Sequence, residues 1–335
     1  MKKKNFKINL VILVLVVIIV QVILLKDNFT SVAKYILQTN YVWIFFACLF
    51  MFLNLFFQTI AQHKFLQTVK PEYKFTSCFK LIMIGQLMNA ITPFSSGGQP
   101  IQVYLLNKEG VKVSDSVNTL MQNFIMYQIA LIFLATIAIL INNAFGVMPK
   151  DSFLRKLVII GYLINTLIIF VLLFISRAKK ANTKSFTKIF NFIFGFRFIK
   201  NKEEKMKKVS DTLDNFYNST ALLKNNKKNT IISFVTNLLS LLCLYMVPLF
   251  VFLSLGEANI NVFRSIILSA YTYLIGSFVP IPGGTGGLEF CFSEFFGMFA
   301  NASLVTAAIL IWRFITYYID MGIGYIVLLF HRGEK

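Results

Sequence analysis

Long stretches of apolar residues alternate with short polar connectors along this chain. A helix that crosses the hydrocarbon core of a bilayer needs about 20 mostly apolar residues. Six stretches meet or approach this length, and they cover residues 10–25, 41–62, 117–141, 157–176, 230–253 and 304–330. The pattern therefore predicts an all-α polytopic membrane protein with about six spanning helices.

Two further apolar stretches are interrupted by proline and glycine. The first covers residues 75–106 and breaks after Pro93, and the second covers residues 262–300 and breaks between Phe278 and Glu289. Proline removes a backbone donor and glycine adds chain entropy, so each break ends one helix and lets another begin. We expect each stretch to form a hairpin of two half-helices that enters and leaves the membrane on the same side.

The two breaks match each other in spacing. Each has two glycines at the fourth and fifth positions after a proline, in the sets Pro93, Gly97, Gly98 and Pro282, Gly286, Gly287. Matched breaks of this kind are typical of transporters built from an internal repeat around a central site. We therefore expect the two hairpins to be related as halves of one repeat.

The distribution of basic residues predicts the topology. Lysine and arginine are concentrated near the N-terminus, between residues 64 and 74, in residues 177–229 and at the C-terminus. The positive-inside rule places these regions in the cytoplasm, with both termini inside. Six spans satisfy this arrangement if the hairpins are re-entrant and oppositely oriented, as an inverted repeat requires. Two full spans in place of each hairpin satisfy it equally, but the arms are short and broken.

Composition agrees with a membrane protein and excludes a soluble globular domain. The 335 residues are 57% hydrophobic, with a mean hydropathy of +0.70. The formal net charge of +19 lies mainly between the apolar stretches, which favours anionic lipid headgroups over nucleic acid as partners. The four cysteines lack the paired spacing of a disulfide framework or a zinc site, and we expect no metal or cofactor. Residues 1–335 are expected to form one integral membrane domain.

Residues 177–229 form the longest polar segment. They contain 14 Lys and Arg against 4 Asp and Glu, a net charge of +10. Apolar residues recur within the segment at three- and four-residue spacing, as in a helix that lies on a membrane surface. We expect a basic amphipathic loop on the cytoplasmic side, and a simply solvated loop is the alternative.

Amide side chains interrupt the apolar spans. Asn54, Gln58 and Gln62 are four residues apart and so lie on one helical face. Amides that face lipid are disfavoured, so this face is expected to meet protein or a wet cavity. Hydrogen bonds between helices, without any substrate contact, explain the pattern as well.

Each break directs the start of a half-helix toward the middle of the membrane. These starts are predicted near Gln99 and Pro100 and near Gly287 and Leu288. Unpaired N–H groups and the positive end of the helix dipole attract a phosphate at such a point. Either break alone reads as a tight turn, whereas a matched pair indicates a binding site.

Ionisable residues at membrane depth add a second indication of a site. Glu289 lies in the first turn after the second break, and Arg313, Tyr317 and Asp320 lie in the last span. Intramembrane charges are expensive and usually face a pathway or a partner. In a regular helix Arg313 and Asp320 share a face about 10 Å apart. Arg313 is thus a candidate for holding a lipid phosphate, with Glu289 or Asp320 as counter-charge or proton carrier. The alternatives are helix capping by Glu289 and a structural ion pair between Arg313 and Asp320.

Residues at and after the two breaks form a recurring pattern, which consists of Asn89, Pro93, Gly97, Gly98, Tyr104, Pro280, Pro282, Gly283, Gly284, Gly286, Glu289 and Arg313. This pattern resembles the lysylphosphatidylglycerol synthase transmembrane (flippase-like) family, the membrane region of the multiple peptide resistance factors, over most of the chain. The family's first motif has Gly-Gly-Glu followed by an arginine, where this chain has Gln99 and Gln102. The resemblance implies that these residues, with Gly287 and Tyr317, bind a lipid headgroup.

The resemblance also implies a function. The expected activity is translocation of an anionic or aminoacylated phospholipid, such as lysyl-phosphatidylglycerol, between leaflets of the bacterial cytoplasmic membrane, which protects against cationic antimicrobial peptides. A transporter is expected rather than an enzyme. Transfer of lysine from charged tRNA to phosphatidylglycerol, and transport of a polyisoprenyl phosphate or small solute, stay open as alternatives. Further partners left open are a second copy of the chain and a separate lipid-modifying synthase.

Overall fold

A computed structural model of the chain describes residues 29–92, 95–148, 153–178, 222, 226–258, 260–276 and 284–333. The regular structure in these residues is helical, and they contain no strand. The long helices are α3 (Tyr41–Leu66), α6 (Val113–Phe145), α7 (Phe153–Ala178) and α10 (Lys227–Ser254). The shorter helices are α2 (Phe29–Leu37), α4 (Phe75–Ala90), α5 (Gly98–Lys108), α11 (Val262–Gly276) and α12 (Gly287–Phe296). The last span comprises α13 (Ala302–Arg313), the π-helix η3 (Phe314–Tyr318) and α14 (Ile319–Gly333).

The described residues contain five stretches that are long and apolar enough to cross a membrane. They are Tyr41–Leu66, Val113–Phe145, Phe153–Phe170, Lys227–Ser254 and Ala302–Phe330, and each coincides with a span predicted from the sequence. The sixth predicted span, residues 10–25, and most of the predicted loop 177–229 lie outside the described residues. The prediction of an all-α polytopic membrane protein is confirmed.

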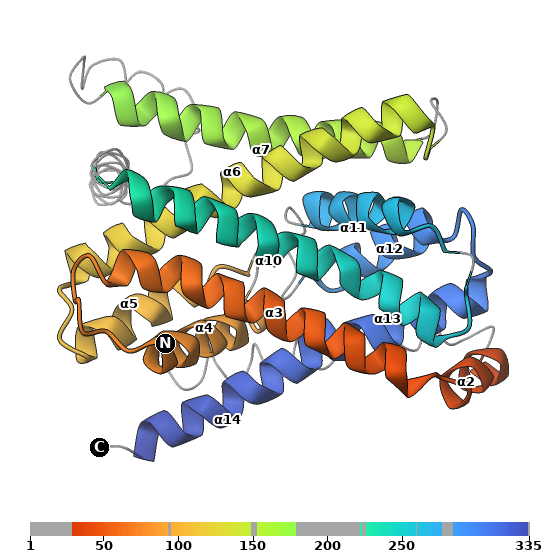
Figure 1. Ribbon diagram of the computed structural model, residues 1–335, viewed down its shortest axis with the longest axis horizontal. Coiled ribbons are helices and arrows are strands. Elements are labelled where there is room, and N and C mark those ends of the chain that lie inside the picture. Colours follow the sequence, from red (N-terminus) through yellow and green to blue (C-terminus); the bar gives the residue numbers. More distant parts are fainter. Residues whose placement is uncertain are drawn as a thin grey trace, which may run out of the picture.

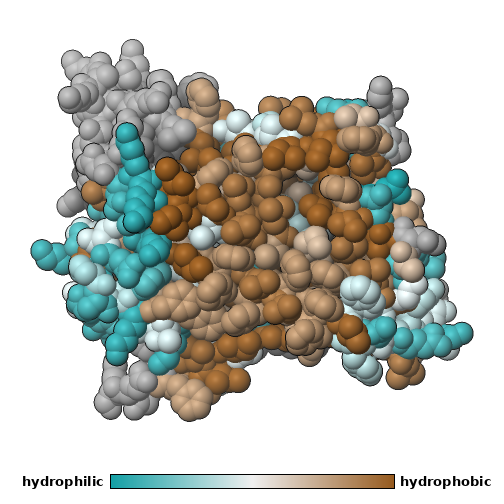
Figure 2. All heavy atoms as spheres, viewed as in Figure 1, coloured by the Kyte–Doolittle hydropathy of each residue, from teal (hydrophilic) through white to brown (hydrophobic). Residues whose placement is uncertain are grey.

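The long helices run roughly along the longest axis of the molecule (Figure 1). Hydrophobic side chains cover the middle of the face shown in Figure 2, and hydrophilic ones gather toward the two ends of that axis. An apolar zone between two polar ends, as on this face, is the surface that a bilayer requires, because lipid solvates apolar side chains and the aqueous phases solvate polar ones. The long axis is therefore the direction in which the chain crosses the membrane.

The two interrupted stretches form two helical pairs. Helix α4 packs on α5, and α11 packs on α12. In Figure 1 the first pair lies toward the left end of the long axis and the second toward the right end. At 1.5 Å per residue each arm is shorter than the roughly 30 Å hydrocarbon core, which is what a re-entrant hairpin needs. Their re-entrant placement in a bilayer stays a prediction.

The last span is not one continuous α-helix, and this overturns a prediction. The π-helix η3 separates Arg313 from Asp320. A π turn adds one residue to a helical turn, which rotates the C-terminal part of the span by about 100° relative to a regular helix. The prediction that Arg313 and Asp320 share a face assumed regular α-helix, and it is wrong for this reason.

The last span packs against both hairpins. Helix α14 lies against α4, and Tyr317 and Leu328 belong to the apolar cluster of the first hairpin. Helix α13 lies against α12, and Trp312 stacks on Phe292 with ring centroids 4.6 Å apart. The residues between α13 and α14 therefore lie between the parts of the last span that contact the two hairpins.

Candidate functional site

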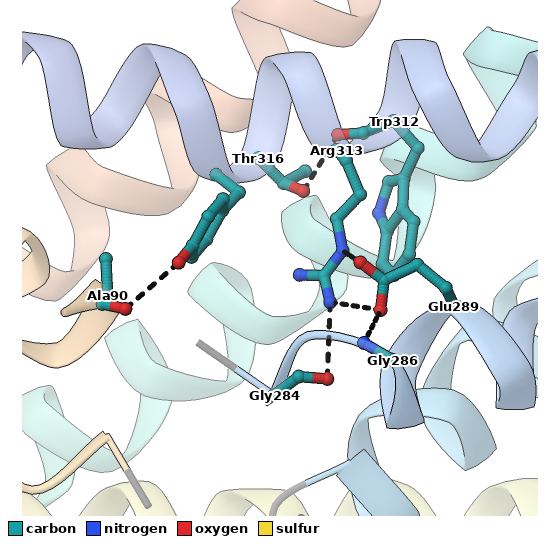
Figure 3. A network of polar contacts seen from close by, with 8 residues as sticks. Ala90, Gly284, Gly286, Glu289, Trp312, Arg313 and Thr316 are labelled. Atoms are coloured by element: carbon teal, nitrogen blue, oxygen red, sulfur yellow. Dashed lines mark hydrogen bonds and ion pairs between the residues drawn. The ribbon is translucent and has the colours of Figure 1, made fainter. Parts of the chain in front are cut away.

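Helix α12 begins with a cap formed by an acidic side chain (Figure 3). The backbone N–H of Gly286 donates to Oε2 of Glu289 at 2.7 Å. Gly286 has φ +88°, a backbone conformation that residues with a Cβ rarely adopt. The prediction that a half-helix starts near Gly287 is confirmed, and glycine is needed at the residue before it.

Glu289 also binds the arginine of the last span. Nε of Arg313 donates to Oε1 of Glu289 at 2.7 Å, and Nη2 donates to Oε2 at 2.8 Å. Both side chains are only 7% exposed. The same Nη2 lies 3.4 Å from the carbonyl oxygen of Gly284, within the second break. The ion partner of Arg313 is Glu289, so the alternative of a structural pair between Arg313 and Asp320 is wrong.

Aromatic rings enclose the guanidinium group. Its carbon atom lies 5.0 Å from the ring centroid of Trp312 and 5.4 Å from that of Tyr317. Contacts of this kind stabilise a cation through the ring quadrupole, and more strongly away from water. The charge of Arg313 is thus compensated by a carboxylate and by two aromatic faces.

Tyr317 connects this cluster to the first hairpin. Its hydroxyl group donates to the carbonyl oxygen of Ala90, the last residue of α4, at 2.9 Å. Arg313 and Tyr317 are four residues apart on the last span. Arg313 contacts the second break at Gly284, and Tyr317 contacts the end of α4 at the first break. The two breaks, nearly two hundred residues apart in sequence, are thus joined through one turn of one helix.

The first break is closed by neutral side chains. The backbone N–H of Gly98 donates to Oδ1 of Asn89, and that of Gly97 donates to Oγ1 of Thr92, both at 2.8 Å. The start of α5 at Gly98 confirms the predicted position. The prediction of unpaired N–H groups for a phosphate is wrong for Gly97, Gly98 and Gly286, because each donates to a side chain of the protein.

A polar cavity of about 160 Å³ lies beside the first hairpin. The hairpin contributes four amide side chains to its wall, from Gln86, Asn89, Gln99 and Gln102. Nε2 of Gln102 also donates to the carbonyl oxygen of Leu81 at 3.3 Å, which ties α5 to α4.

Three long helices complete the cavity wall. Gln58 and Gln62 come from α3, Asn123 from α6 and Asn237 from α10. Asn237 donates to Asn123 at 3.0 Å, and Gln86 of the hairpin donates to Gln58 at 3.0 Å. The prediction that the amide face of α3 meets protein or a wet cavity is confirmed. Its third amide, Asn54, binds Ser240 of α10 instead.

The structure brings some predicted site residues together and leaves others apart. Gly284, Gly286, Glu289, Arg313 and Tyr317 gather at the second break, and the set Asn89, Gly97, Gly98, Gln99 and Gln102 gathers at the first. Tyr104 is 52% exposed and lies outside the cavity wall, with the Lys108 ammonium 4.7 Å from its ring centroid. Asp320 is 7% exposed in α14 and has no ion pair within the described residues. Pro93, Pro280, Pro282 and Gly283 lie outside the described residues.

Sequence reasoning missed several members of the site. Gly85 lines the cavity, and a Cβ built there lies 2.5 Å from Nε2 of Gln102. Asn237 was not predicted to belong to the site. It is an amide in the middle of an apolar span, which is the pattern that indicated Asn54 and Gln58. Trp312 carries no signal in sequence, since a buried tryptophan looks the same wherever it packs.

The chain is similar to a known protein family and to a known membrane protein. A family model described as the lysylphosphatidylglycerol synthase TM region matches residues 8–324. A protein described as a UPF0104 membrane protein, from Archaeoglobus fulgidus, is 23% identical over 260 residues, which is 75% of this chain and 74% of that protein. The family match covers both breaks, the cavity and the Arg313–Glu289 pair.

Proposed function

The chain belongs to the lysylphosphatidylglycerol synthase TM region family, and from this premise we propose that it moves a phospholipid between the two leaflets of a membrane. The proposed cargo has an anionic or aminoacylated headgroup. The proposed location is the bacterial cytoplasmic membrane, where such transport protects against cationic antimicrobial peptides. We further propose that the chain forms one membrane domain, with residues 177–229 on the cytoplasmic side.

The observation that carries this proposal is the buried Arg313–Glu289 pair. Two charges inside an apolar helix bundle cost free energy, and in membrane proteins they usually mark a pathway for a polar substrate. The pair lies in the last span next to the turn that contacts both breaks. Sites at the meeting of two broken hairpins are where repeat-built transporters bind their cargo.

The apolar zone on the surface and the amide-lined cavity also support lipid translocation. A headgroup that crosses a bilayer needs polar groups at membrane depth to replace water. The chain offers neutral amides at the first hairpin and a charged pair at the second. Arg313 and the cavity amides of α3, α6 and α10 belong to helices long enough to cross a membrane, which supports the proposal.

Reconstitution into liposomes tests the proposal. Vesicles are prepared with tail-labelled phosphatidylglycerol, lysyl-phosphatidylglycerol or a polyisoprenyl phosphate, and a membrane-impermeant quencher measures how much label reaches the outer leaflet. We expect exchange of at least one phospholipid faster than in protein-free vesicles and in vesicles that hold heat-inactivated protein. Equal rates in all three preparations, for every lipid, exclude translocation.

A further inference from the structure

The amide-lined cavity has a chemistry of its own. The Arg313–Glu289 pair does not line it, and among the described residues in its wall no side chain carries a charge. Apart from the hydroxyl group of Tyr127, its polar side chains are all amides, contributed by helices α3, α4, α5, α6 and α10. A cavity this polar in an apolar bundle is large enough for several water molecules or one small polar group.

One amide nitrogen of a residue in the wall lacks a partner. Gln62 is 1% exposed, and its Nε2 has no hydrogen-bond partner within the described residues. Leaving a buried donor unsatisfied costs free energy, so such groups usually find a partner in bound water or a ligand. Nε2 of Gln62 is itself inaccessible to solvent, so an occupant of the cavity reaches this free donor only when the side-chain amide turns toward it.

The amides define which occupant fits. Each amide offers one acceptor oxygen and two donor hydrogens, and a hydroxyl group likewise donates and accepts. An ammonium group only donates and carries a charge, and a phosphate only accepts and carries the opposite charge. Neither charge finds a counter-charge among the residues of the wall, and burying an uncompensated charge is far more costly than burying a hydroxyl group.

We infer that this cavity binds an uncharged polyhydroxyl group, the glycerol or sugar moiety of a lipid headgroup, and excludes the ammonium-bearing lysyl group. The inference rests on the proposed function, because the lipid pathway brings a headgroup to this depth. It narrows the cargo to lipids whose headgroup ends in hydroxyl groups. In this proposal the amide of Gln62 turns toward the cavity and donates to one of those hydroxyl groups.

Lipid binding to the purified full-length chain tests the inference. The protein is kept in a detergent without a sugar headgroup and offered equal amounts of four lipids with the same acyl chains. These are phosphatidylglycerol, monoglucosyl-diacylglycerol, lysyl-phosphatidylglycerol and phosphatidic acid, and native mass spectrometry measures how much of each is retained. The first two carry hydroxyl groups, the third adds the lysyl cation, and the fourth is the phosphate without a headgroup.

We expect the two hydroxyl-bearing lipids to be retained about fivefold more than the other two, the factor that one hydrogen bond of about 1 kcal/mol confers. Retention of phosphatidylglycerol alone assigns the cavity to glycerol, and retention of the glucosyl lipid alone assigns it to a sugar. Retention of lysyl-phosphatidylglycerol equal to or above that of phosphatidylglycerol overturns the inference. This comparison uses the unaltered protein, so it does not depend on whether any variant folds.

Variants then locate the binding. Gln62→Met removes the free donor and is expected to lower retention of the hydroxyl-bearing lipids about fivefold, with phosphatidic acid unchanged. Gln38→Met, at an exposed glutamine in the turn after α2, is the matched control and leaves all four unchanged. Loss of phosphatidic acid to the same extent in Gln62→Met contradicts recognition of the headgroup. If the hydroxyl-bearing lipids are retained selectively but no lipid exchanges between leaflets, only the proposed function is wrong. If lipids exchange between leaflets but are not retained selectively, only this inference is wrong.

Discussion

Arg313 and Glu289, 24 residues apart in sequence, form two parallel hydrogen bonds of 2.7 and 2.8 Å inside the helix bundle. Bidentate arginine–carboxylate pairs are among the strongest polar contacts in proteins. Glu289 also accepts a hydrogen bond from the N–H of Gly286. The same carboxylate therefore caps the N-terminus of α12 and binds the last span. A phosphate that reached Arg313 would compete with a carboxylate already in place.

Breaking this pair from either side is expected to destabilise the protein. Arg313→Leu or Glu289→Leu leaves one buried charge without its partner, which costs about 3–5 kcal/mol. The double variant Arg313→Leu with Glu289→Leu removes both charges and is expected to recover a large part of that loss. Thermal unfolding of the purified proteins in detergent measures all three.

The same variants separate stability from transport. If the pair only holds the fold, the double variant exchanges lipid at the wild-type rate. We expect it to fold and yet exchange lipid slowly, because the charged group at membrane depth is gone. A double variant that is no more stable than the single variants contradicts the account of the ion pair.

Tyr317→Phe is expected to loosen the connection between the two breaks. The substitution removes the hydroxyl group that donates to Ala90 and leaves the packing of the ring in place. The expected loss is about 1 kcal/mol of unfolding free energy, with a clear fall in the rate of leaflet exchange. Tyr325→Phe, on the exposed side of the same span, is the control and is expected to change neither quantity.

Two glycines of α14 offer a matched pair of substitutions. A Cβ at Gly324 would lie 2.5 Å from the carbonyl oxygen of Met83 in α4, whereas a Cβ at Gly322 would meet nothing within 4 Å. Gly324→Ala is expected to push α14 from α4 and destabilise the protein by about 1–3 kcal/mol. Gly322→Ala is expected to be neutral or to stabilise by up to about 1 kcal/mol, since alanine favours a helix. Equal melting temperatures for the two variants would refute the close packing of α4 and α14.

A pH dependence is expected from the connector between α3 and α4. The hydroxyl group of Tyr73 donates to Oε2 of Glu109 at 2.7 Å. Burial, and after it this hydrogen bond, raises the pKa of Tyr73 above its ordinary value of about 10. The unfolded chain then releases this proton from about pH 10 upward while the folded chain keeps it, so stability falls as the pH rises above 10.

Denaturation at a series of pH values measures this slope. Tyr73→Phe is expected to lower stability at neutral pH by about 1 kcal/mol and to flatten the decline above pH 10. Tyr41→Phe, at an exposed tyrosine, is expected to leave both unchanged. An identical decline above pH 10 in wild type and Tyr73→Phe would assign it to other groups.

Sequence alone predicted the spans and the helix starts at the breaks because both depend on local composition. Runs of about 20 apolar residues specify a membrane helix wherever they pack. A glycine pair after a proline specifies where a half-helix begins, and α5 and α12 begin at Gly98 and Gly287 as expected.

Partners across the bundle were not predictable in the same way. The sequence predicted two alternative counter-charges for Arg313, Asp320 in its own span and Glu289 after the second break, and did not decide between them. The structure pairs Arg313 with Glu289, from another helix. The π-helix that separates Arg313 from Asp320 was not predicted from residues 314–318. The cavity likewise depends on five helices that bring their amides to one cavity wall, and the sequence identified amides only helix by helix.

The position of Trp312 has an optical consequence. The chain contains two tryptophans, and Trp43→Phe would leave Trp312 as the single indole emitter. That ring is fully buried, stacks on Phe292 of the second hairpin and lies 5.0 Å from the guanidinium carbon of Arg313. Its emission wavelength and quenching therefore follow the charge and hydration of the site in real time. If the proposed lipid cargo reaches the Arg313 site, the fluorescence of this variant would report its arrival without a dye.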